Sequence, residues 1–89
     1  MKQVEISCSE IRSREQLHSL LARELAFPAW YGGNLDALFD CLTELPQETK
    51  LILTGWKALQ ENLGDYAVRL ICVLHQANEE NPQFQVDLE

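Results

Sequence analysis

Two aspartates, Asp36 and Asp40, stand four residues apart in the sequence. If this segment is helical, the spacing places both carboxylates on one face of the helix. Paired carboxylates can serve as a general acid and base, ligate a metal ion, or bind a basic surface through charge-assisted hydrogen bonds. Which of these chemistries applies depends on the groups around the pair.

The enzymatic and metal-binding interpretations lack supporting residues. Acid and base catalysis by two carboxylates needs different environments for the two groups, and one exposed helix offers none. No cluster of His or Glu supplies further metal ligands, and His18 and His75 fall on separate predicted helices beside apolar stripes, where histidine usually serves packing. The sequence also lacks a phosphate-binding glycine loop and a nucleophile elbow. We therefore expect neither an enzyme nor a bound metal or other cofactor.

The binding interpretation explains the pair better. Two like charges at this spacing cost an isolated helix a few tenths of a kcal/mol, roughly, and the helix dipole offsets only part of that at Asp36. A basic partner would turn the repulsion into several charge-assisted hydrogen bonds. The alternative is a solvated helix face with Phe39 at the edge of the core.

Local signals predict the helix that positions the two aspartates. Asn34 is a good N-cap, because its side-chain oxygen can accept from a free N–H of the first turn, and the two glycines before it permit a sharp bend. The helix should begin at about Leu35. Leu35, Leu38 and Leu42 then form a buried stripe, and the two aspartates lie on another face.

The chain before this helix contains one strand and one helix. Residues 3–6 alternate apolar and polar side chains as in a half-buried strand. Ser13 and Gln16 have the spacing of a capping box, which opens a helix that stops before Pro28. The strand is therefore followed by two consecutive helices.

The chain after Pro46 repeats this pattern. The expected elements are a buried strand over 51–53, a short helix over 56–63, a longer helix over 66–80 and a strand over 84–88. Strands separated by helical crossovers favour a parallel sheet. We expect an α/β fold in which a small three-stranded parallel sheet is packed with about four helices, as a single domain over residues 1–89. The order of the strands stays open.

The charge distribution favours a basic partner. Fourteen acidic and seven basic residues give a net charge of −7. No Lys or Arg occurs between Arg23 and Lys50, and five acidic residues do. The resulting negative electrostatic field argues against direct binding to nucleic acid or to an anionic membrane.

Cysteine usage indicates the cytoplasm. The three cysteines cannot all pair within one chain, and their spacing fits neither a zinc motif nor a redox pair. We expect Cys41 and Cys72 to be small buried side chains and Cys8, in a loop, to be the candidate for reactivity. The N-terminal residues lack the apolar core of a signal peptide, and no stretch has the length of a membrane span.

The stretch Leu-Ala-Phe-Pro-Ala-Trp-Tyr-Gly-Gly-Asn-Leu-Asp-Ala-Leu-Phe-Asp-Cys-Leu-Thr, residues 25–43, closely resembles the barstar family. These proteins are intracellular inhibitors of the bacterial ribonuclease barnase. The Ile-Arg-Ser of residues 11–13, with the Leu-His that follows at 17–18, resembles the family's first helix and its lead-in. The resemblance extends over the whole chain and is most specific over residues 11–43. It implies the same α/β fold.

The resemblance also implies roles for individual residues. Asp40 matches the main anchor of the family, a carboxylate that enters the ribonuclease active site as a phosphate mimic. Asp36 would add a second contact of this kind. Tyr31, Gly32 and Asn34 match positions in the binding loop and at the start of the helix.

Four positions depart from the family pattern. Trp30 replaces a tyrosine that stacks on the enzyme, and Phe39 replaces a tryptophan, so an indole N–H donor is lost. Leu45 stands where the family has a second interface tryptophan, and Gln76 where it has a glutamate. An inhibitor that keeps the central anchor residue but differs at the edge of its interface is expected if its partner is a related ribonuclease with a different surface.

The sequence therefore predicts a cytoplasmic inhibitor that blocks the active site of a basic, extracellular-type, barnase-like ribonuclease. We expect it to be a monomer when free, and to bind neither nucleic acid nor membrane. The alternative is a binding module of the same fold whose target is a different basic protein or a toxin that is not a ribonuclease.

Overall fold

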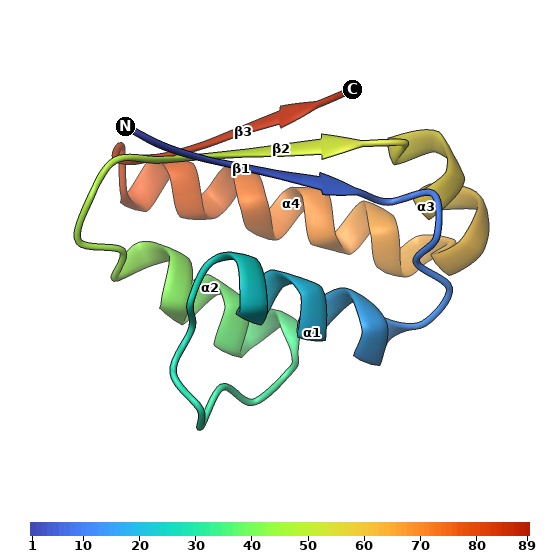
Figure 1. Ribbon diagram of the computed structural model, residues 1–89, viewed down its shortest axis with the longest axis horizontal. Helices are drawn as coiled ribbons and strands as arrows, with labels where there is room; N and C mark the ends of the chain where they lie inside the picture. The colour runs from blue at the N-terminus through green and yellow to red at the C-terminus, as the bar shows by residue number, and fades with distance from the viewer.

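The computed structural model describes residues 1–89 and has the predicted alternating order of elements (Figure 1). The elements are β1 (Lys2–Ser7), α1 (Arg14–Glu24), α2 (Leu35–Thr43), β2 (Thr49–Thr54), α3 (Trp56–Leu63), α4 (Asp65–Glu80) and β3 (Phe84–Leu88). The predicted α/β class, with four helices and three strands, is confirmed.

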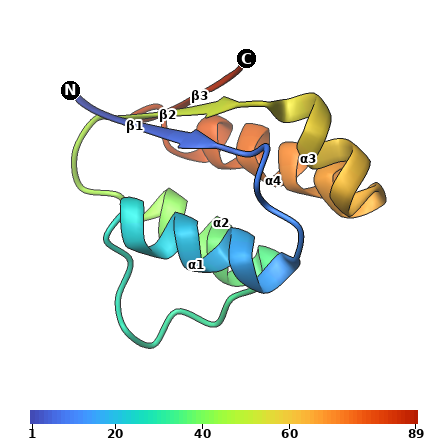
Figure 2. The same cartoon turned by 45° about the vertical axis from the view of Figure 1, so that its right-hand side comes forward.

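The three strands form one parallel sheet in the order β1-β2-β3. Val4, Leu51 and Val86 lie side by side across it. The helices cover one face, and the loop between α1 and α2 projects away from the sheet (Figures 1 and 2). The strand order, which the sequence left open, places the most apolar strand in the centre, where neighbours cover both of its edges.

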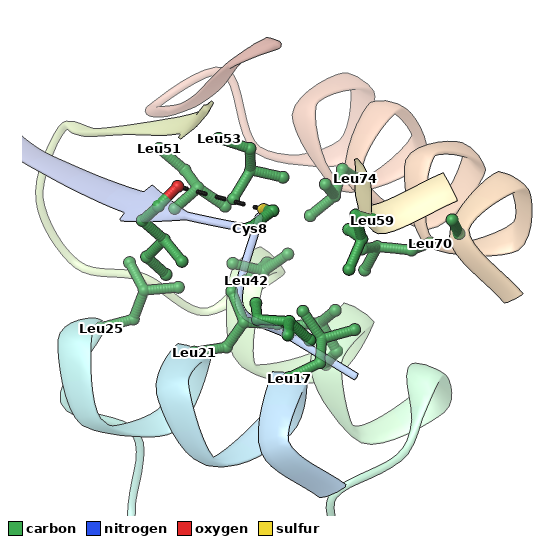
Figure 3. Packing of buried hydrophobic residues seen from close by; sticks show 14 of the residues in the cluster. Cys8, Leu17, Leu21, Leu25, Leu42, Leu51, Leu53, Leu59, Leu70 and Leu74 are labelled. Atoms are coloured by element: carbon green, nitrogen blue, oxygen red, sulfur yellow. Dashed lines mark hydrogen bonds between the residues drawn. The ribbon is translucent and has the colours of Figure 1, made fainter. Parts of the chain in front are cut away.

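The core lies between the sheet and the helices. Leu51 and Leu53 from β2 are fully buried, as are Leu70 and Leu74 from α4 and Leu42 from α2. Figure 3 shows these side chains converging with those of α1. Because α2 contributes to this core, its outer face is held at a fixed orientation.

The capping box at the start of α1 forms with one difference. The Ser13 hydroxyl accepts from the backbone N–H of Gln16 at 3.1 Å, as expected. The Gln16 side chain accepts in return from the N–H of Arg12 at 2.8 Å, one residue before the cap. The box therefore also fixes the lead-in to the helix. The helix ends at Glu24, before Pro28.

Two predictions about the cysteines are wrong. Cys8 is fully buried, since the chain turns into the core directly after β1, and burial raises the pKa of its thiol to about 11 (Figure 3). Cys72 is exposed, because it lies about 200° around α4 from the buried Leu70. Cys41 is half-buried. The residue expected to react is thus the most protected of the three.

No helix combines the length and the apolar character that crossing a membrane requires.

Candidate functional site

The helix that carries the two aspartates is held at both ends by asparagine side chains. At its start, Asn34 Oδ1 accepts from the N–H of Ala37 at 2.8 Å, so the predicted cap and the start at Leu35 are confirmed. At its end, the buried Asn81 donates from Nδ2 to the carbonyl of Leu42 at 3.0 Å and to that of Leu45 at 3.4 Å. Backbone groups that a nine-residue helix leaves free are thereby satisfied.

The two aspartates face solvent, and neither takes part in an intramolecular ion pair. The two ion pairs of the molecule join Arg23 to Glu24 and Lys50 to Asp87. The carboxylates of α2 are therefore fully available to an external cation.

A hollow of about 280 Å³ lies at the surface where α2 and α4 meet. Asp36, Phe39 and Asp40 line it from α2, and Val73 and Gln76 line it from α4. Residues distant in sequence thus share one surface. Phe39 is half-buried and lines the hollow together with the two aspartates.

A second hollow of about 280 Å³ lies on the other side of Asp40. Trp30, Gly32, Cys41 and Glu44 line it together with Asp40. Trp30 is 79% exposed, which is unusual for so large an apolar side chain. Asp40 therefore stands on a ridge between two hollows, one with an exposed indole at its edge.

We call this region the acidic surface. Its members are the sequence-predicted residues that line the two hollows: Trp30, Gly32, Asp36, Phe39, Asp40 and Gln76. Asn34 supports it as the cap of α2 and is exposed beside Asp36.

Tyr31, the remaining predicted site residue, points into the molecule. Its hydroxyl lies 2.6 Å from Nδ1 of His18, and its ring packs against Phe27 with 4.9 Å between the ring centroids. Burial raises the pKa of the Tyr31 hydroxyl. The side chain thus ties the loop to α1.

The predicted packing role holds for one histidine and fails for the other. His18 is buried, and its second ring nitrogen, Nε2, lies 2.6 Å from the hydroxyl of Tyr66. His75 is exposed, because it lies outside the buried stripe of α4. Sequence reasoning missed Tyr66, because no spacing links residues of α1, the loop and α4. The only signal was a histidine in an apolar stripe.

The acidic surface does not resemble a metal centre. The structure contains no cluster of three or more His, Cys, Asp or Glu side chains that could hold a metal ion. Asp36 and Asp40 are instead arranged as a pair of exposed anions on a braced helix, an arrangement suited to meeting a basic surface.

Comparison with known proteins identifies the family. A family model described as "Barstar (barnase inhibitor)" matches residues 1–89. The chain belongs to the barstar family. It is 37% identical over 93 residues to a Bacillus subtilis (strain 168) protein named "Putative ribonuclease inhibitor YrdF", and the alignment covers the whole of both chains.

Proposed function

We propose that this protein inhibits a barnase-like bacterial ribonuclease by placing its acidic surface in the enzyme's active site. Membership of the barstar family and the description of the Bacillus subtilis relative support a ribonuclease inhibitor in place of an enzyme. The observation that carries the proposal is Asp40, an exposed and unpaired carboxylate on the ridge between two hollows.

Asp40 acts as the phosphate mimic. A ribonuclease active site holds a phosphodiester with basic side chains, and these would bind a carboxylate through charge-assisted hydrogen bonds. Because α2 is capped at one end by Asn34 and held at the other by Asn81, the carboxylate is presented by a rigid element. Little conformational entropy is then lost on binding.

The neighbours of Asp40 supply the remaining contacts. Asp36 binds a second basic group, and the exposed indole of Trp30 stacks on the enzyme surface. Phe39 gives apolar contact, and the uncharged amide of Gln76 contacts the rim. Gly32 and Asn34 place the loop and the helix start. The net charge of −7 accelerates the encounter with a basic enzyme.

The protein would act as a monomeric single domain in the cytoplasm, where it protects the producing cell before the ribonuclease is exported. All three cysteines are free thiols, as is usual in a reducing compartment.

The test is the rate of RNA cleavage by a barnase-type ribonuclease with and without an equimolar amount of the protein. Asp40→Ala and the isosteric Asp40→Asn should both weaken inhibition strongly, so that far more protein is needed for half-maximal inhibition. Glu61→Ala is the matched control, because it removes one exposed negative charge from α3, outside the acidic surface. It should inhibit like the wild type.

Two results would contradict the proposal. Inhibition by both Asp40 variants at the same concentration as the wild type would remove the anchor role. No inhibition by the wild type would instead favour the second candidate, a module of this fold that binds another basic protein or a toxin of different activity.

A further inference from the structure

Tyr66, in the first turn of α4, has no part in the acidic surface described above, yet it is held by two strong contacts. Its hydroxyl lies 2.6 Å from Nε2 of His18, and the guanidinium of Arg14 lies over its ring, 4.3 Å from the centroid. The side chain is only 8% exposed. Two residues of α1 thus fix the ring and the hydroxyl of a side chain that belongs to α4.

The imidazole of His18 links Tyr66 to the binding loop. Its Nδ1 lies 2.6 Å from the hydroxyl of Tyr31, while Nε2 meets Tyr66. A neutral imidazole has one N–H donor and one acceptor nitrogen, so one tyrosine must donate and the other must accept. Burial lowers the pKa of His18, which keeps the ring neutral at pH 7. The hydrogen bond of one tyrosine therefore sets the role of the other.

The loop has few other connections to the rest of the molecule. Residues 28–33 take part in one backbone hydrogen bond, from the N–H of Tyr31 to the carbonyl of Pro28 at 3.0 Å, and this bond lies within the loop. Gly33 adopts φ +67°, a conformation that favours glycine and does not itself hold the chain in place. The side chain of Tyr31 is thus the main polar attachment of this segment.

We propose that Tyr66 is a positioning residue for the loop that carries Trp30 and Gly32. It acts through His18, whose ring orientation it fixes by the hydrogen bond to Nε2, and His18 in turn holds the hydroxyl of Tyr31. Since Trp30 and Gly32 are the chain neighbours of Tyr31, the position of the loop side of the acidic surface depends on a residue of α4.

The test uses the free protein and measures amide hydrogen exchange. Tyr66→Phe keeps the ring for Arg14 and removes only the hydroxyl. Exchange of the Tyr31 amide, the one amide of this loop that donates to a backbone carbonyl, should accelerate by about threefold to tenfold, as expected for the loss of one net hydrogen bond. The amides of α3, which lies outside the network, serve as the internal reference.

Two further variants separate positioning from a general loss of stability. Tyr31→Phe breaks the same chain from the loop end, so its effect and that of Tyr66→Phe should not add in the double variant. Thr54→Val is the matched control, because it removes a hydroxyl that contacts the carbonyl of Ile6 in the sheet. It should leave exchange of the Tyr31 amide unchanged relative to the amides of α3.

The proposal is overturned if Tyr66→Phe changes loop and α3 exchange equally or not at all, or if the two tyrosine effects add fully. Should Tyr66→Phe fail to fold, the imidazole nitrogen resonances of the wild type decide the question. A proton held between Nε2 and the Tyr66 hydroxyl, seen as slow exchange with water, supports the proposal, and exchange as fast as at the His75 ring contradicts it. His75 is the exposed reference in the same spectrum.

Only the consequence for ribonuclease binding rests on the proposed function. If that function holds, Tyr66→Phe should speed dissociation of the complex by a similar factor. Because the exchange experiment needs no ribonuclease, failure of the positioning role and failure of the inhibitor role are told apart.

Discussion

The helices α2 and α4 lie against each other and are stabilised in different ways. The nine residues of α2 bury Leu38 and Leu42 and depend on asparagine side chains at both ends. The sixteen residues of α4 have no side-chain cap at their start and bury five positions. The longer helix is held mainly by packing, and the shorter one by less packing together with side-chain hydrogen bonds at its ends. This division leaves one face of α2 free to carry unpaired charge.

The largest expected effect is the loss of ribonuclease binding when the unpaired charge on α2 is removed. Asp40→Ala should weaken binding of a barnase-type ribonuclease by about 2 to 5 kcal/mol, because the basic groups facing it would be left buried and unpaired. The free energy of unfolding should change by less than about 0.5 kcal/mol, since the side chain is exposed. Titration calorimetry and urea unfolding measure the two quantities. Equal losses in both would contradict the division of roles.

The opposite result is expected for α4. Leu70→Ala removes a fully buried side chain and should lower the free energy of unfolding by about 2 to 5 kcal/mol. At a temperature where the variant remains folded, inhibition should be kept. Val68→Ala, at an exposed position two residues earlier, is the control and should unfold like the wild type. A variant that stays stable but no longer inhibits would show that α4 does more than support α2.

A smaller effect is expected at the cap of α2. Asn34→Ala should destabilise the protein by about 1 kcal/mol, because the N–H of Ala37 loses its acceptor. Asn34→Asp keeps an acceptor oxygen and should restore most of the stability. Thermal unfolding of the three proteins checks the order. If Asn34→Asp lowers the stability as much as Asn34→Ala does, the asparagine does more than cap the helix.

The smallest effect concerns pH and the histidine network. Burial lowers the pKa of His18 in the folded state below its ordinary value of 6.5, so the unfolded chain binds a proton first as the pH falls. The free energy of unfolding should therefore decrease below about pH 6.5, by at most about 1.4 kcal/mol per pH unit from this group. His18→Gln should remove this part of the slope in urea unfolding between pH 5 and 7. His75→Gln, at an exposed position, should retain it.

Local signals made much of the fold predictable from sequence. Asn34 and Ser13 cap their helices as expected, because a cap depends only on residues three positions away. The alternating order of elements followed from apolar periodicity and from the breaks at glycine and proline. The strand order did not, since nothing local distinguishes a central strand from an edge strand.

The errors came from packing between elements. Cys8 was expected to be the reactive cysteine because it lies in a loop, and the turn after β1 buries it instead. Cys72 and His75 were expected to be buried because they lie in or beside an apolar segment of α4. Only one face of that helix is buried, and both residues lie on its exposed face. Within the site, the hollow that brings Gln76 beside Asp40 and the link from Tyr66 to the loop both join distant elements. Only the resemblance to a family anticipated Gln76, and nothing anticipated Tyr66.

The parallel sheet also constrains the order in which the protein can fold. β1 pairs with β2 from Lys2 alongside Thr49, and the whole of α1, the loop and α2 lies between these strands. Closing that long connection loses chain entropy before the strands can pair, which slows folding. The asparagine that holds the end of α2 comes from residue 81, close to β3. We therefore expect ribonuclease binding to emerge late in refolding, after the last strand has joined the sheet, and a stopped-flow refolding assay with inhibition as its readout would reveal that delay.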